Sequence, residues 1–204
     1  SEPVTISEFM KDVETLLDGS VATDGYLIGD DADSYIQDLS MIDFDALQAK
    51  FDNGKKNTEV ERLKSAIDRS LAKMVEQNPS RTDFQERFEK LIDEYNSGSS
   101  NIDIIFKALV TFTAELNDEE ERHNRENLSQ GELAIFDILT RPDMSLTDKE
   151  SEDIKQVCRN MLNTLKAEKL VLDWKKHPNT VADVVVTIET VLDTGLPPKY
   201  EKEV

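Results

Sequence analysis

The residues that could do chemistry are few, and their spacing completes no catalytic or metal site. The chain has two histidines, His123 and His177, and one cysteine, Cys158. Glu120 and His123 have the E-x-x-H spacing of helical di-metal sites, but such a site needs two of these pairs and two further carboxylates. We therefore expect His123 to be an exposed histidine that pairs with Glu119 or Glu120 one helical turn back. Metal binding is the less favoured alternative, since a site needs its full set of ligands.

Two ligand-binding motifs are begun but not completed. The pair Gly54-Lys55 is followed by Lys56 instead of serine or threonine, and Ala49 stands where a P-loop needs its first glycine. The segment Asp31-Ala32-Asp33 lacks the glycine and the distal glutamate of an EF-hand loop.

Cys158 lies near an apolar stripe, so we expect a buried thiol rather than a nucleophile. A catalytic cluster of residues that are far apart in the sequence and meet only in the folded protein remains an open alternative.

The remaining candidate is a contact surface. Trp174 lies between two predicted helices and is followed by Lys175 and Lys176, with Lys166 and Lys169 a few residues before it. A tryptophan is more often a core anchor, but beside lysines at a connection it can also be an interface hot spot. The lysine strip is either the solvated end of a helix or a local basic surface. We predict Trp174, Lys175, Lys176 and Lys169 as partner contacts.

The elements that position these residues follow a helical period. Apolar residues spaced by three or four positions predict a helix over 57–77, capped by Asn57 and ended at Asn78-Pro79. A second helix over 80–96 stops at Gly98. These two segments predict a helical hairpin with a tight turn at Pro79.

The next predicted helix is the centre of the fold. Ser100 and Asp103 open it with an S-x-x-D start, and from Ile104 to Leu116 it is apolar on nearly all sides. Such a helix is typical of the buried centre of a domain. Its continuation over 118–123 is strongly charged and predicts a solvated extension.

The C-terminal half shows two capping boxes and a valine-rich helix. Ser129–Glu132 and Thr147–Glu150 each precede an apolar helical stripe. The last helix begins near Asn179 and stops at Gly195, and its valines keep a helical period despite their preference for strands. No hairpin of alternating strands is indicated. The predicted fold class is therefore all-α: an irregular multi-helix bundle with a helical hairpin and a long central helix.

Charge and composition bound the organisation. The chain has 204 residues and a formal net charge of −19. Residues 1–50 have 12 acidic and 2 basic side chains, and they predict a short helix over 6–17 followed by an acidic connector. We place a soft boundary near Phe51, so 1–50 is an acidic helical tail of a preceding domain plus linker, and 51–204 is a C-terminal helical domain.

The same composition excludes some partners and compartments. An acidic surface repels duplex DNA. No apolar run suits a membrane span and no secretory leader is indicated. One cysteine cannot form an internal disulfide, which is compatible with a cytoplasmic protein.

From about Asp38 onward the sequence resembles the C-terminal region of the R subunit of type I restriction enzymes. Each matching stretch is weak alone, but their order and spacing over about 160 residues are specific. The stretches are Asp43–Leu47, Lys56–Glu59, Leu63, Asn78–Phe84, Leu91–Asn96, Leu128-Ser129, Glu132–Asp137, Asp173-Trp174 and the last helix leading into Pro197-Pro198. The first 40 residues match less clearly.

The resemblance implies a piece of a larger subunit. Subunits of that family have an endonuclease domain, two RecA-like motor domains and a helical domain, and they cleave DNA after ATP-driven translocation. The nuclease and motor motifs are not in this sequence, so no catalytic residue and no cofactor is expected in this part, whereas ATP and Mg are expected for the parent chain.

The resemblance implies that this region helps to dock the motor subunit onto the methyltransferase core of the complex. Its partners would be the methyltransferase and specificity subunits and the preceding motor and helical domains, with DNA reached only through the parent complex and no membrane. A regulatory module that binds nucleotide or DNA during translocation is the alternative. An autonomous enzyme is the third and least favoured.

Overall fold

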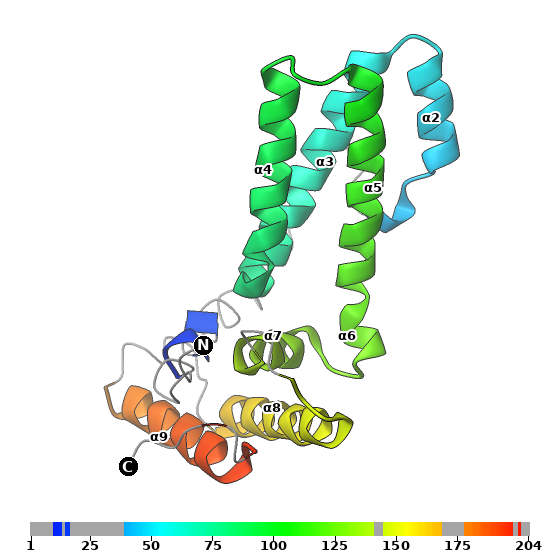
Figure 1. Cartoon of the computed structure of the whole chain (residues 1–204). Helices are drawn as coiled ribbons and strands as arrows, with labels where there is room; N and C mark the ends of the chain where they lie inside the picture. The colour runs from blue at the N-terminus through cyan, green and yellow to red at the C-terminus, as the bar shows by residue number, and fades with distance from the viewer. Residues whose placement is uncertain are drawn as a thin grey trace. The chain divides into compact units, whose positions relative to one another are not determined.

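The described part of the chain consists of α-helices joined by short connections. The structure is a computed structural model that describes residues 10–13, 15–16, 39–140, 145–168, 178–197 and 200. No strand occurs among these residues, which confirms the predicted all-α class. Residues 10–13 and 15–16 are helical. The labelled helices are α2 (Phe44–Asp52), α3 (Lys56–Gln77), α4 (Thr82–Asn96), α5 (Ile102–Glu120), α6 (Arg122–Arg125), α7 (Gln130–Leu139), α8 (Asp148–Glu168) and α9 (Pro178–Gly195), with 3₁₀ turns at Leu39–Met41 and Pro79–Arg81 (Figure 1).

By contact, the chain divides into two compact units. Unit 1 comprises Ser1–Tyr26 and His123–Val204, and unit 2 comprises Leu27–Arg122. This division differs from the boundary that the sequence placed near Phe51. Phe51 is 1% exposed in the core of unit 2, while Val13 and Leu16 belong to the core of unit 1. The excess of acidic side chains falls near residue 50, but residues on both sides of this position, such as Leu47 and Phe51, pack in the same core.

Unit 2 is the predicted helical hairpin completed by α5. Figure 1 shows α3, α4 and α5 side by side. The stripe predicted for α3 is buried, and α5 packs its own apolar side chains against it in one core. Aromatic rings reinforce this core: Phe51 stacks on Phe106 with centroids 4.0 Å apart, and Phe88 stacks on Phe112 at 5.7 Å.

The central helix α5 is less uniformly buried than predicted. Phe106, Leu109 and Leu116 are buried as expected. Ile104, however, is 61% exposed. It lies in the first turn, where only part of the helix circumference has neighbours. The prediction of burial on nearly all sides was therefore wrong at Ile104.

Two predicted helix caps were also wrong, for local reasons. Gly54 has φ +92° and turns the chain directly out of α2, so α3 begins at Lys56 and Asn57 lies in its first turn. At α5 the cap is Asn101, whose Oδ1 accepts a hydrogen bond from the Asp103 N–H at 2.8 Å. Ser100 lies one residue before that cap.

Unit 1 contains α7, α8 and α9 around its own apolar core. Both capping boxes are present: Ser129 and Glu132 bond reciprocally, as do Thr147 and Glu150. The valine-rich segment is helix α9, which confirms the helical period over strand propensity. Gly195 ends α9, and a Cβ there would meet Val157 Cγ2 at 2.5 Å, so only glycine allows this approach to α8.

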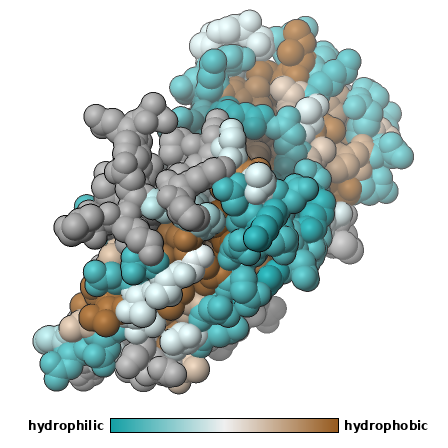
Figure 2. All heavy atoms as spheres, turned by 60° about the horizontal axis from the view of Figure 1, so that its bottom comes forward, coloured by the Kyte–Doolittle hydropathy of each residue, from teal (hydrophilic) through white to brown (hydrophobic). Residues whose placement is uncertain are grey.

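Apolar side chains also reach the surface. On the face that Figure 2 presents, brown apolar residues lie in separate patches among teal hydrophilic ones. The most exposed large apolar residues in the described ranges are Ile104 at 61% and Val186, on α9, at 59%. Within those ranges, no helix combines the length and apolarity needed to cross a membrane.

Candidate functional site

The four residues predicted as partner contacts lie outside the described residues. Trp174, Lys175, Lys176 and Lys169 fall between α8 and α9, so their arrangement stays a prediction. Lys166, from the same lysine strip, lies exposed in the last turn of α8. The predicted basic surface is therefore described only at its first lysine.

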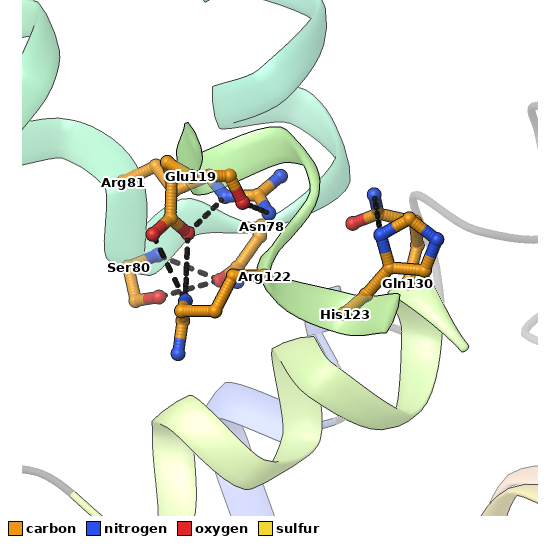
Figure 3. Close-up of polar contacts among 7 residues, drawn as sticks. All are labelled: Asn78, Ser80, Arg81, Glu119, Arg122, His123 and Gln130. Carbon is orange, nitrogen blue, oxygen red and sulfur yellow. Dashed lines mark hydrogen bonds and ion pairs between the residues drawn. The ribbon is translucent and has the colours of Figure 1, made fainter. Parts of the chain in front are cut away.

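Three charged side chains form a largely buried ion-pair cluster in unit 2 (Figure 3). Arg81 ends the 3₁₀ turn before α4, and Glu119 lies in the last turn of α5, with Arg122 just after it. The Arg81 Nε is 3.0 Å from Glu119 Oε1, and the Arg122 Nε is 2.9 Å from Glu119 Oε2. Their side chains are 2%, 13% and 27% exposed in the order Arg81, Glu119, Arg122. This cluster joins the hairpin turn to the end of α5, in a segment predicted to be solvated.

The local sequence explains how Arg81 reaches α5. Asn78 precedes proline and is extended, as residues before proline prefer. Its Oδ1 accepts hydrogen bonds from the Ser80 backbone N–H at 3.1 Å and the Ser80 hydroxyl at 2.6 Å. These bonds fix the turn, and Arg81 Nη2 also donates to the Glu119 carbonyl at 3.4 Å. The sequence predicted the tight turn but carried no signal for this pairing.

His123 differs from its predicted setting. It is half-buried rather than exposed. Its Nδ1 lies 3.1 Å from Gln130 Nε2 at the start of α7 (Figure 3). Glu119, one of the two partners predicted for it, instead engages Arg81 and Arg122.

Lys155 is the most enclosed lysine among the described residues, and it is held as a cation. It is 8% exposed, and its Nζ lies 2.9 Å from both Glu126 Oε2 and Glu152 Oε1. Burial alone would lower the pKa of Lys155, but hydrogen bonds and the charges of Glu126 and Glu152 outweigh it and raise the pKa. Nucleophilic or Schiff-base chemistry needs a lowered lysine pKa. The neutral form of Lys155 is therefore disfavoured, and its ion pairs join α8 to Glu126 within unit 1.

We expect Lys155→Met to lower the stability of the chain by about 1 kcal/mol near neutral pH, since two ion pairs are lost while the apolar stem is kept. The raised pKa of Lys155 means that its contribution is complete below the ordinary value of 10.5 and is lost as pH rises through the folded value. The pKa of Glu152 is lowered by its hydrogen bond to Lys155, so its contribution is lost as pH falls through that lowered value.

Urea unfolding of both proteins from pH 3 to 11 measures this dependence. The difference between wild type and variant should be constant between about pH 5 and 10 and shrink on either side. Lys166→Met, at the exposed lysine on the same helix, is the control. A difference that stays constant over the whole pH range contradicts the assignment.

Two further groups that could react are buried. Cys158 is fully buried as predicted, and burial raises the pKa of its thiol, so the reactive thiolate is disfavoured. The Tyr200 hydroxyl donates a hydrogen bond to the Leu139 carbonyl at 2.6 Å, and burial likewise raises its pKa. Across the part of the chain that the structure describes, no group of three or more His, Cys, Asp or Glu is placed to hold a metal ion.

One concave surface belongs to unit 2, between α3 and α4. We call it the α3–α4 groove. It has a volume of about 290 Å³ and is lined by Glu61, Lys64, Ser65, Asp68, Phe88, Glu89, Ile92 and Asp93. The sequence did not predict it, because it requires the pairing of two helix faces.

The fold and these clusters define an all-α protein whose described ion pairs stabilise its own helices. Comparison with known proteins makes the class specific. A family model described as "Type I restriction enzyme HindI endonuclease subunit-like, C-terminal" matches residues 2–204, and the chain belongs to this family. The resemblance found in the sequence is confirmed.

One curated relative matches about half of this chain and is far longer than the matched part. The putative type I restriction enzyme MjaIXP endonuclease subunit of Methanocaldococcus jannaschii is 28% identical over 112 residues, which is 53% of this chain and 10% of that protein. The chain therefore matches about a tenth of the relative's length. No solved structure matches.

Proposed function

We propose that this chain is a non-catalytic helical docking domain of a type I restriction enzyme motor subunit. Its role is assembly of that subunit with the methyltransferase and specificity subunits. The observation that carries the proposal is the family match over residues 2–204, which is to the C-terminal part of the endonuclease subunit. In this proposal, DNA translocation and cleavage, ATP and Mg belong to other parts of a cytoplasmic parent chain.

The chemistry of the described residues supports a role without catalysis. Glu119 pairs with both Arg81 and Arg122, and Lys155 is held as a cation between two glutamates. Gly54, from the Gly54-Lys55 pair of the incomplete P-loop motif, instead turns the chain between α2 and α3 with φ +92°. These groups hold helices together or connect them, and a docking domain requires no catalytic group beyond them.

Deletion of this chain from the full endonuclease subunit tests the proposal. We expect binding to the purified methyltransferase–specificity complex to weaken at least about 100-fold, because a central interface carries several kcal/mol. Surface plasmon resonance measures the affinity, and ATP binding by the truncated subunit shows that its motor domains remain folded. Unimpaired assembly of the truncated subunit would overturn the proposal.

The regulatory alternative has a separate test. Calorimetry of this chain with ATP and with duplex DNA at low salt detects direct binding, since low salt strengthens phosphate contacts. Heat of binding with either ligand favours the regulatory module. No heat with either leaves docking as the better account.

A further inference from the structure

The α3–α4 groove is incompletely covered by the rest of unit 2. Phe88 is the buried residue of α4. The other large apolar side chains of α4 are only half-buried, namely Phe84, Leu91, Ile92 and Tyr95. Buried Phe88 and half-buried Ile92 line the groove, so it has an apolar floor. The amphipathic face of α4 thus extends beyond what α3 and α5 cover.

The rim of the groove is acidic. It carries Glu61 and Asp68 from α3 and Glu89 and Asp93 from α4, against the single cation Lys64. Lys64 lies 3.5 Å from Glu61, so that cation already has a partner. Among the described residues, the carboxylates of Asp68 and Asp93 have neither an ion pair nor a side-chain hydrogen bond. One such carboxylate stands on each wall of the groove.

Size and charge together select the occupant. A volume of about 290 Å³ is at the lower end for small-molecule pockets, which run from about 300 to 1,000 Å³. It therefore suits one apolar anchor side chain rather than a nucleotide, whose phosphates the acidic rim also repels. A second copy of this chain, with a net charge of −19, is disfavoured for the same reason. A segment with Lys or Arg beside an apolar residue complements both the rim and the floor.

We propose that the α3–α4 groove docks a Lys- or Arg-bearing amphipathic segment of the methyltransferase–specificity core. An apolar side chain of that segment packs on Phe88 and Ile92, and its basic side chains pair with Asp68 and Asp93. The inference rests on the docking function proposed above and names the surface that performs it. Opposite charges across the contact speed association and make it depend on salt.

Two matched charge reversals in the full endonuclease subunit test the groove. The first carries Asp68→Lys and Asp93→Lys, and the second carries Glu76→Lys and Glu94→Lys. All four acids are exposed, and each pair takes one acid from α3 and one from α4, but only Asp68 and Asp93 line the groove. Both variants change the net charge by the same amount, and circular dichroism checks that each is folded.

We expect the groove variant to bind the purified core at least about 10-fold more weakly, mainly through slower association that responds less to salt. The control variant should stay within about 3-fold of wild type, since rim charges outside a contact matter little. Equal weakening in both variants indicates bulk charge and overturns the groove. Unchanged binding by the groove variant also overturns it.

The deletion experiment separates this failure from failure of docking itself. If deletion abolishes assembly but the groove variant assembles normally, docking stands and the groove is wrong, which makes Trp174 and its lysines the next surface to test. If deletion has no effect, both proposals fall.

A photo-reactive amino acid in place of Ser65, an exposed groove residue, identifies the occupant. The crosslinked peptide, found by mass spectrometry, should come from the methyltransferase–specificity core and contain Lys or Arg. A crosslink to the endonuclease subunit's own chain overturns the assignment of a partner segment.

Discussion

Replacing Phe51 by alanine is expected to lower the free energy of unfolding of unit 2 by about 3–5 kcal/mol, the usual cost of removing a buried aromatic side chain. Phe51 is 1% exposed and stacks on Phe106 at 4.0 Å between ring centroids. The Lys56 Nζ lies 5.0 Å from the same ring. The substitution removes these contacts and leaves a cavity beside helices that cannot fully close it.

Native-state hydrogen exchange of amides in α3 and α5 measures this loss without treating the whole chain as one two-state system. The control is Ile104→Ala on α5, because that side chain is 61% exposed. It should change stability by less than about 0.5 kcal/mol. An equally small effect of Phe51→Ala would mean that α2 is not part of the unit 2 core.

The Phe51 result bears on what the sequence could not predict. The boundary near Phe51 followed the charge profile, which changes there. Contacts instead place Phe51 against α5 and place Val13 and Leu16 in the core that contains α7, α8 and α9. Charge along a chain describes its solvation, whereas the division into units depends on contacts between residues far apart in sequence.

Local signals were predictable because they involve neighbours. The reciprocal bonds of Ser129 with Glu132 and of Thr147 with Glu150 join residues three apart, so their spacing alone indicated a helix start. The period of α9 identified a helix although valine favours strands. The predicted cap at Asn57 was wrong because the chain turns at Gly54 and α3 begins at Lys56. The spacing of apolar residues does not indicate such a turn.

Long-range features had no such signal. Arg81 and Glu119 are 38 residues apart, and nothing in either segment indicates the other. The α3–α4 groove likewise depends on which faces of two helices meet, and its acids are spread over residues 61–93. The sequence therefore predicted the helices that build unit 2 but neither its ion-pair cluster nor its concave surface.

The cluster at Glu119 gives the second large expected effect. Glu119→Gln keeps the shape of the side chain but removes the carboxylate that Arg81 and Arg122 share. Arg81 is only 2% exposed, so water cannot replace that charge. Loss of one partner from a buried pair costs about 3–5 kcal/mol, and we expect about 3 here because Arg122 is partly solvated and adapts.

Glu115→Gln is the matched control, since Glu115 is also on α5 and also pairs with an arginine, Arg87 of α4. That pair is roughly half exposed, with side chains 51% and 42% accessible, so its loss should cost less than about 1 kcal/mol. Both variants replace one carboxylate oxygen by an amide nitrogen and remove the same charge, and hydrogen exchange in α3 and α5 again reports on unit 2. Burial is then the main difference between them. Equal costs would show that the Glu119 cluster is solvated and does not hold the hairpin turn against α5.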